Sequence, residues 1–538
     1  MARRTEEIAS REGRVESAPT SRSEAPERDA DKTGGDGNTI RSRRGWGPLD
    51  WLALVSITLG AGIMRLFRVA DPHQFVFDEV YYAKDACMYV HASLQTCRLE
   101  DFQNEVHPPL GKWLIATGIK IFGFNSLGYR IAVVVTGTLT IALLFLLART
   151  ILRSTLGASL AAGLLAIDPL HFVQSRTSML DIFVPFFAVA AFLFLALDRR
   201  SLLEALPGGG RKRPRGMVLG RPWRLAAGIA AGGAFASKWS GAFVIAALIV
   251  LALAWEIGAR KKEGRATAVV RTLRHEGPTI VMWLVVVPAV FYVVTYIGRG
   301  LEGPVLALPW SDGSWWRSFW DEQYESWIFH TQSLKDSSHP YQSPGWSWIL
   351  LKRPVSYFFE TDDEGNYLEI MATGSPFVWW ASIVAVLYVT WEWLRRSKLG
   401  RPEGVILAGF FFTYGPWLLP VDRPTVFLFY FVTTIPFMCL ALAYVALRIG
   451  RSWEARSAIA AFAAISLAFF VFYFPLLTKR PIPEKEWSER LLFFDDCDKP
   501  PGKTVTTTVT KTTRGTTTTS PSVSDSNEDV PPPGWCWI

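Results

Sequence analysis

The chain has 538 residues, of which 50% are hydrophobic, 14% aromatic and 19% charged, and its formal net charge is +8. Soluble proteins carry roughly 25% charged residues. Here the polar residues gather at both ends, so the central part is far more apolar than the mean. This excludes a soluble globular enzyme, a disulfide-dense secreted domain and a protein that binds nucleic acid through bulk charge. The composition predicts a polytopic membrane protein.

The first segment, residues 1–48, is rich in Arg, Glu, Ser and Gly and holds almost no large apolar side chains. Such a segment cannot bury enough surface to order itself, so we expect a disordered cytoplasmic tail. It also lacks the apolar core of a signal peptide.

Apolar runs long enough to cross a bilayer, about 20 residues each, recur through residues 49–475. The fifth and sixth of these runs are short and rich in Gly and Ala. We therefore expect one all-α transmembrane domain. Its eleven predicted spans lie near residues 49–69, 128–148, 156–172, 178–197, 225–239, 241–257, 278–297, 376–394, 404–420, 425–447 and 457–475.

The charges between the spans predict the orientation of the chain. The runs 211–213 and 260–262 consist only of Lys and Arg, and loops rich in these residues stay in the cytoplasm. The N-terminus is then cytoplasmic, while the long loops 70–127 and 298–375 and the C-terminal segment 476–538 are external. We expect a multi-pass protein of the cell membrane.

The external segments have two distinct compositions. The second long loop holds Trp310, Trp315, Trp316, Trp320, Trp327, Trp346 and Trp348. Because Trp prefers the membrane–water interface, we expect amphipathic helices on the outer leaflet, although anchoring alone would explain any single Trp. The tail is dense in Thr, Ser and Pro around 504–519, which predicts an extended, disordered stalk and a candidate O-glycan acceptor.

The cysteines fit this topology. Cys439 lies within a predicted span, whereas Cys87 and Cys97 share the first external loop and Cys497 and Cys536 share the external tail. The external side is oxidising, so we predict the disulfides Cys87–Cys97 and Cys497–Cys536. No cysteine spacing resembles a zinc site.

Two adjacent carboxylates, Asp78 and Glu79, follow the first span. Neighbouring side chains point in different directions, so one carboxylate can face a site while the other holds the turn. A carboxylate can serve as general base for a hydroxyl nucleophile within hydrogen-bonding reach. By itself, an Asp-Glu pair is more often a pair of solvated loop charges.

A second motif in the same loop is His107-Pro108-Pro109-Leu110-Gly111-Lys112. The two prolines predict a helix start, where free N–H groups and a lysine can hold an anion. A membrane-surface helix cap is the plainer interpretation.

Other polar residues fall where predicted spans meet the external face. A single basic residue there is usually a boundary charge that reaches toward water. Several of them at one level, interleaved with carboxylates, suit the phosphate of a lipid instead. These further candidates are Arg130, Arg176, Asp181, Lys238, Arg423 and Tyr430.

The chemistry that this pattern indicates is transfer from a lipid-linked phosphate donor. A carboxylate would deprotonate the acceptor, and the cations would stabilise the departing phosphate, where charge develops in the transition state. Within residues 49–475 no Asp-x-Asp motif for a metal-bound nucleotide stands out, which favours a lipid over a nucleotide donor, and no motif indicates a divalent metal or another cofactor.

Three motifs, in this order, resemble the protein O-mannosyltransferases, which are membrane glycosyltransferases of the GT-C class (family GT39). They are Phe77-Asp78-Glu79, the run from Val106 to Lys112, and the run from Arg176 to Asp181; the runs 237–240 and 339–344 extend the match. The resemblance covers residues 50–480 and is greatest to actinobacterial members.

This resemblance implies an eleven-span GT-C fold with catalysis on the extracytoplasmic side. It implies a polyprenyl-phosphate mannose donor, Ser/Thr hydroxyls of secreted proteins as acceptors, and inversion at the anomeric carbon; the secretion translocon is a further expected partner. Asp78 is the expected base, with Glu79 beside it. Arg130 is implied as a functional arginine and Arg423 as a phosphate contact. The residues implied to line the site are His107, Lys112, Arg176, Asp181 and Lys238.

Two alternatives stay open at the level of sequence. One is another GT-C enzyme that moves a pentose or aminoarabinose from a lipid phosphate to a cell-wall lipid or glycan. The other is a lipid flippase or transporter, which would show internal repeats and charges near the bilayer midplane. The sequence shows no repeat, and its charges gather at one face.

Overall fold

A computed structural model gives the fold. It describes residues 45–91, 93–99, 106–204, 220–260, 264–297, 314–335, 339, 341–396, 402–419, 425–450, 452–491, 508–513 and 516–521. The predicted partners Cys497 and Cys536, the candidate Arg423 and almost all of the N-terminal tail lie outside these residues.

Seven helices within the described residues are long and apolar enough to cross a membrane. They lie at Pro48–Leu66, Ser126–Leu152, Leu180–Leu202, Trp239–Ala259, Ala266–Thr295, Pro376–Arg395 and Trp453–Leu477. Each coincides with a predicted span, and this confirms a multi-pass helical membrane protein. The other four predicted spans correspond to shorter helices.

The helices of the first half have the following bounds. They are α1 (Pro48–Leu66), α5 (Ser126–Leu152), α6 (Thr155–Ala166), α7 (Pro169–Gln174), the turn η1 (Leu180–Ile182), α8 (Phe183–Glu204), α9 (Pro222–Ser237), the turn η3 (Trp239–Gly241), α10 (Ala242–Ala259) and α11 (Arg265–Val281). The π-helical turn η5 (Met282–Val286) joins α11 to α12 (Val287–Thr295). The seventh span is therefore the end of a longer helical segment than predicted.

The second half contributes α15 (Pro376–Arg396), α16 (Pro402–Tyr414), the turns η7 (Gly415–Leu418) and η8 (Leu428–Thr433), α17 (Ile435–Ile449), α18 (Trp453–Tyr473) and the turn η9 (Phe474–Leu477). The predicted tenth span begins instead with η8, a 3₁₀ segment ahead of α17.

The short, Gly- and Ala-rich helix α9 packs closely between its neighbours. A Cβ added at Gly228 would lie 1.9 Å from the backbone oxygen of Trp283 in η5, and one at Gly233 would lie 2.6 Å from the ring of Phe187 in α8. A side chain at either position would collide with the neighbouring helix, and small residues let membrane helices pack this closely. The composition of α9 is therefore a packing requirement.

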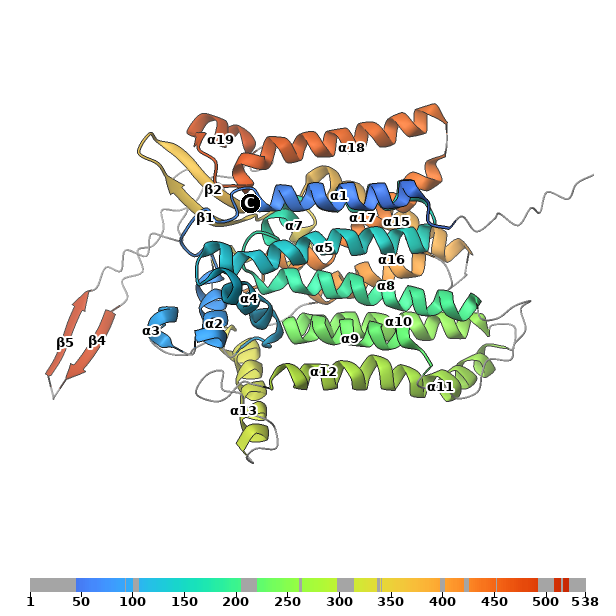
Figure 1. Cartoon of the computed structure of the whole chain (residues 1–538), viewed down its shortest axis with the longest axis horizontal. Helices are drawn as coiled ribbons and strands as arrows, with labels where there is room; N and C mark the ends of the chain where they lie inside the picture. Colours follow the sequence, from blue (N-terminus) through green and yellow to red (C-terminus); the bar gives the residue numbers. More distant parts are fainter. Residues whose placement is uncertain are drawn as a thin grey trace, which may run out of the picture. The chain divides into compact units, whose positions relative to one another are not determined.

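Both predicted external loops gather at one end of the long helices (Figure 1). The first forms α2 (Glu79–His91), α3 (Leu94–Cys97) and α4 (Leu110–Phe122), and the predicted disulfide Cys87–Cys97 is present. The second forms α13 (Ser314–Ile328), the π-helical turn η6 (Phe329–Ser333) and α14 (Gly345–Trp348). We call this end the loop end.

A small antiparallel sheet adds to the predicted all-α architecture. Strands β1 (Val355–Thr361) and β2 (Asn366–Ala372) form a hairpin, and β3 (Ile482–Pro483) pairs with β2. Helix α19 (Glu484–Arg490) packs on this sheet, where the Trp487 indole N–H donates to the buried carboxyl of Glu369 at 2.7 Å. Burial raises the pKa of Glu369 to about 7.

The Thr-rich tail differs from the predicted disordered stalk in one short stretch. There, β4 (Thr508–Thr513) pairs with β5 (Thr516–Pro521) in antiparallel register. Thr is β-branched and favours extended strands, which accounts for this pairing.

A charged network ties helices together at the opposite end. Asp198 of α8 accepts hydrogen bonds from Arg221 at 3.0 and 2.7 Å and from Arg224 of α9 at 3.2 Å. Glu276 of α11 accepts from Arg221 at 2.7 Å, and the hydroxyl of Thr279 accepts from Arg224 at 2.7 Å. We call these five residues the arginine network.

Candidate active site

The turn before α2 separates the roles of its two adjacent carboxylates. The Glu79 side chain is fully buried and accepts hydrogen bonds from the backbone N–H groups of Val76 at 2.9 Å and Ser178 at 2.7 Å. Asp78, one residue earlier, is half-buried. Glu79 is therefore a structural anchor, while Asp78 stays accessible.

Arg130, near the start of α5, completes this anchor. Its guanidinium donates to both carboxylate oxygens of Glu79 at 2.8 and 2.7 Å and to the backbone oxygens of Val69, Pro72 and Gln74 at 3.0, 2.8 and 3.1 Å. These bonds use all five donors of an arginine. In this structure the Arg130 side chain therefore holds the turn in position, and the predicted contact with a lipid phosphate stays a prediction.

Phe77 holds the other side of the turn. Its backbone adopts φ = 49°, a left-handed conformation that is uncommon for a bulky residue and is found at functional sites. Its ring stacks on Tyr357 of β1 with 4.7 Å between centroids. The Tyr357 hydroxyl in turn accepts a hydrogen bond from Gln174 of α7 at 2.8 Å.

Asp181, Lys238 and Tyr430 come together from three separate parts of the chain. The Lys238 ammonium donates to both Asp181 oxygens at 2.8 and 2.9 Å and lies 4.2 Å from the centre of the Tyr430 ring. Asp181 belongs to η1, Lys238 follows α9, and Tyr430 lies in η8. The sequence predicted all three as candidates, and the fold makes them neighbours.

Two buried phenols connect this group to Asp78. The Tyr82 hydroxyl lies 3.5 Å from an Asp78 oxygen. Burial, followed by the charges of Asp78 and Asp181, raises the pKa of Tyr82 well above its usual value, and burial with the same two charges also raises the pKa of Tyr357. We call Asp78, Tyr82, Asp181, Lys238, Tyr357 and Tyr430 the loop-end cluster.

The sequence-based interpretation missed Tyr82, Tyr357 and Gln174. Tyr82 stands one helical turn after Asp78, and this i, i+4 spacing could have identified it. Nothing near Tyr357 or Gln174 in the sequence marks them, because only the packing of β1 against α7 and the Phe77 turn brings them to the site.

Lys112 has a structural partner. Its ammonium lies 2.9 Å from Asp85 of α2, and both side chains are buried. This ion pair joins α4 to α2, the helix that carries the Asp78 turn. The predicted phosphate contact through Lys112 is thus replaced by an internal ion pair in this structure.

His107 lies beside the cluster. Its ring is 5.8 Å from the Tyr82 ring and 5.3 Å from that of His330 in η6, and the His330 Nε2 lies 3.1 Å from the backbone oxygen of Val106. The two histidines connect the two external loops next to Tyr82.

Arg176 follows α7 and is buried, with its guanidinium 5.0 Å from the Phe172 ring. Its Nη1 atom has no hydrogen-bond partner among the described residues. Its electrostatic neighbours are Arg130, Arg68 and Asp71 rather than the loop-end cluster. Because an unpaired buried guanidinium nitrogen is costly, Arg176 is suited to an incoming anion.

The described residues include no group of three or more His, Cys, Asp or Glu side chains that could hold a metal ion. What they do assemble is an accessible carboxylate next to a lysine and buried phenols, at the end of a bundle of membrane helices. This fold and site define a polytopic helical membrane protein with a charged and phenolic site at one end of its bundle.

Comparison with known proteins narrows the class to a family. The profile of the family "Dolichyl-phosphate-mannose-protein mannosyltransferase" matches residues 123–298, and that of the "C-terminal four TMM region of protein-O-mannosyltransferase" matches residues 315–495. The chain belongs to the protein O-mannosyltransferase family.

Relatives cover most of the chain. A polyprenol-phosphate-mannose–protein mannosyltransferase of Mycolicibacterium smegmatis is 31% identical over 82% of this chain and 93% of its own length. One from Corynebacterium glutamicum is 31% identical over 84% and 94%. The solved Saccharomyces cerevisiae Pmt1–Pmt2 complex bound to the sugar donor has a TM-score of 0.65 at 16% identity, covering 84% of this chain and 93% of that one. This likeness confirms the predicted GT-C class of fold, while the number of eleven spans stays a prediction.

Proposed function

We propose that the protein transfers mannose from polyprenyl-phosphate mannose to Ser or Thr hydroxyls of secreted proteins, on the extracytoplasmic side of the membrane and with inversion. The observation that carries this proposal is the half-buried Asp78, which is linked through Tyr82 to the Lys238–Asp181 ion pair. The names of the bacterial relatives support the donor and the protein acceptor.

Asp78 acts as the general base. It removes the proton of the acceptor hydroxyl while the hydroxyl oxygen attacks the anomeric carbon of mannose. The bond between that carbon and the phosphate oxygen breaks, and its electron pair leaves with the lipid phosphate. Attack on the face opposite the departing phosphate inverts the anomeric centre.

The phosphate needs cations that are already in place when its charge develops. Lys238 is suited to this role because its ammonium is held between Asp181 and the Tyr430 ring. Arg176 has a buried Nη1 that lacks a partner among the described residues, but its charged neighbours are Arg130, Arg68 and Asp71, so it is not grouped with Lys238. Arg423, the third expected contact, lies outside the described residues, whereas Lys112 and Arg130 position the helices that carry the site.

The sidedness of the reaction is part of the proposal. The basic runs 211–213 and 260–262 belong to loops on the cytoplasmic side under the positive-inside rule. The loop end, with both long loops, then faces outward, where secreted proteins emerge and the secretion translocon would deliver them. The chain's own Thr-rich tail is on this side and is a candidate acceptor.

The test is transfer of radiolabelled mannose from polyprenyl-phosphate mannose by purified protein to a peptide with the sequence of residues 504–519. We expect transfer by the native chain and loss of transfer in Asp78→Asn. Transfer from a pentose or aminoarabinose donor, but not from the mannose donor, would show that the transferred sugar is not mannose and would favour the alternative GT-C enzyme. Full activity in both Asp78→Asn and Glu79→Gln would overturn the site.

A further inference from the structure

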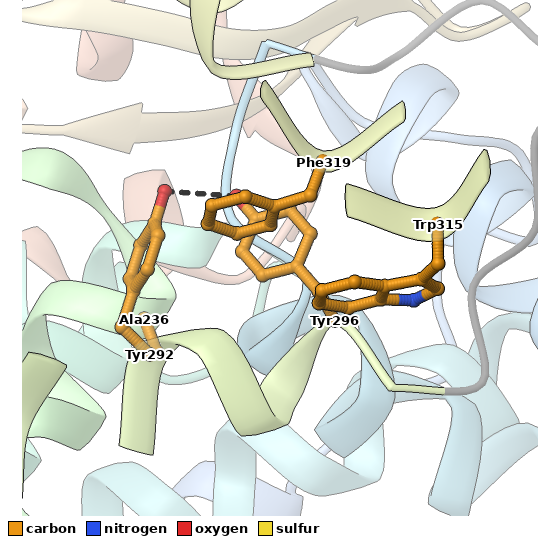
Figure 2. Packing of buried hydrophobic residues seen from close by; sticks show 5 residues of the cluster. All are labelled: Ala236, Tyr292, Tyr296, Trp315 and Phe319. Carbon is orange, nitrogen blue, oxygen red and sulfur yellow. Dashed lines mark hydrogen bonds between the residues drawn. The ribbon is translucent and has the colours of Figure 1, made fainter. Parts of the chain in front are cut away.

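Helix α13 docks on the bundle through one aromatic face. Figure 2 shows Trp315 and Phe319 of α13 against Tyr296, with Tyr292 and Ala236 beside them. The Trp315 and Phe319 rings stack with 5.5 Å between centroids, and Phe319 meets Tyr296 edge to face at 5.1 Å. All five residues are buried, so this face is occupied.

Hydrogen bonds fix the docked position. The Tyr292 hydroxyl donates to the Gln323 side-chain oxygen of α13 at 2.6 Å and lies 2.9 Å from the Tyr296 hydroxyl (dashed line in Figure 2). It also accepts from the indole N–H of Trp239 at 3.0 Å. The polar ends of buried aromatic side chains are therefore satisfied, and α13 has one orientation on α12.

A second aromatic face of α13 is exposed. Trp316, Trp320, Tyr324 and Trp327 expose 47%, 64%, 62% and 57% of their surface. At about 100° per residue these four positions fall within about 80° of arc. Isolated exposed aromatic residues are normal, but a contiguous patch of this kind marks an interaction surface.

The helix on whose end α13 docks exposes a row of apolar side chains. Along η5 and α12, Val286, Val290 and Val294 expose 39%, 55% and 49% of their surface, which is expected for a membrane-spanning helix. Val294 stands two residues before Tyr296, on which α13 docks. In Figure 1, α13 runs across the ends of the long helices at the loop end, the direction of a helix parallel to the membrane plane.

We propose that α13 lies in the headgroup region of the outer leaflet, with Trp316, Trp320, Tyr324 and Trp327 inserted at the membrane–water interface. Trp and Tyr are the residues that this region favours. Beyond the aromatic arc, α13 carries the exposed pair Arg317 and Asp321 and then Glu325, all suited to face water. Because this polar face is acidic overall, insertion depends on aromatic burial and not on anionic lipids.

Membrane contact of α13 also bears on the site. The helix continues directly into η6, where His330 lies 5.3 Å from the His107 ring and 5.6 Å from the Trp239 ring. Trp239 is the residue next to Lys238. Anchoring α13 in the interface thus adds to the internal packing that holds this part of the loop end in place.

The test uses the full chain in nanodiscs of phosphatidylcholine and needs no mannosyl transfer, so it is independent of the proposed function. A photoreactive benzoylphenylalanine replaces Trp320 in α13, Val290 in lipid-facing α12 as the positive control, or Glu325 on the polar face as the negative control. After irradiation, phospholipid adducts are quantified by intact mass.

We expect a phospholipid adduct at position 320 with a yield within about twofold of that at 290, and no adduct at 325. The yield should be unchanged when half of the lipid is phosphatidylglycerol. An adduct at 290 without one at 320, or a cross-link from 320 to a second protein chain, would overturn the proposal. Dependence of the yield at 320 on anionic lipid would overturn its aromatic basis.

Discussion

The two ends of the helix bundle handle buried charge in opposite ways. In the arginine network, Asp198 and Glu276 meet the forked donors of Arg221 and Arg224, and the closest contacts are 2.7 Å. In the loop-end cluster, a single lysine meets Asp181 and an aromatic face, and the half-buried Asp78 lies 3.5 Å from a tyrosine hydroxyl.

The difference is between permanent ion pairs that hold helices together, which we call locking residues, and charged groups that can change their partners. A guanidinium is planar and always charged and bonds a carboxylate at two points, which suits a permanent crosslink between helices. A lysine is a point charge on a flexible stem that can turn from one acceptor to another. The arginine network therefore stabilises α8, α9 and α11, whereas the loop-end cluster can exchange partners when a phosphate arrives. The neighbours Glu79 and Asp78 differ in the same way: Glu79 is held in an ion pair with Arg130, whereas Asp78 is half-buried.

The largest expected effect is on the loop end. Asp78→Asn removes the base, and we expect the rate of mannosyl transfer to fall by about 10²–10⁴, with the melting temperature unchanged. Transfer kinetics and thermal unfolding in detergent check both parts. Asp363→Asn, at an exposed position in the β1–β2 turn, is the matched control and should keep full activity. A lower melting temperature in Asp78→Asn would place Asp78 among the locking residues.

At the opposite end, Asp198→Asn removes one of the two carboxylates that Arg221 and Arg224 share, and Glu276 remains. Breaking a buried ion pair costs about 3–5 kcal/mol, so we expect a markedly lower melting temperature. The transfer rate per folded molecule should stay within about twofold. Arg456→Gln, an exposed arginine of α18, is the control for loss of a charge. A variant that unfolds normally but transfers poorly would contradict the division between the two ends.

Glu369 is a buried carboxyl that belongs to neither the arginine network nor the loop-end cluster, and its predicted effect is on the pH dependence of stability. Its pKa is raised by burial from 4.5 to about 7, so the folded chain holds the proton more tightly than the unfolded chain does. Stability is then highest below about pH 4.5 and is lost as the pH rises to about 7, by up to about 3 kcal/mol.

Glu369→Gln mimics the protonated acid. We therefore expect this variant to melt at a higher temperature than the native chain at pH 8, and at the same temperature at pH 4.5. Thermal scans across this range check the sign. A constant difference between the two chains at all pH values would mean that Glu369 does not titrate there.

The smallest expected effect is on donor binding. Lys238→Gln removes one proposed phosphate cation, and we expect the KM for the lipid donor to rise about tenfold, equivalent to about 1.4 kcal/mol, the lower end for a charged hydrogen bond. It also leaves the buried Asp181 carboxylate without its lysine, so we expect a lower melting temperature as well. Lys238→Arg should recover part of the affinity, while Lys485→Gln, at an exposed position of α19, should change nothing. An unchanged KM with a lower melting temperature would make the lysine a locking residue too.

Much of the fold was predictable because lipid imposes simple rules on sequence. A span must be long, apolar and helical, so the positions of α1, α5, α8, α15 and α18 follow from composition alone. Departures occur where other forces compete. The β1–β2 hairpin lies in a loop whose Trp content predicted interfacial helices, and η5 extends a helix whose first half, α11, is too polar to be read as a span.

The sequence by itself determined which residue types the loop end would offer, because ionisable groups next to membrane spans are costly and persist where they are needed. It could not determine their roles. Glu79 and Asp78 are adjacent in the chain, and Lys112 and Lys238 are both buried lysines that pair with an aspartate. Only the tertiary structure makes Glu79 and Lys112 crosslinks between helices. It places Asp78 and Lys238 in the cluster that contains Tyr82, Tyr357 and Tyr430. The physical reason is that a role depends on which acceptors and donors lie within about 3 Å, and packing between distant segments sets those distances.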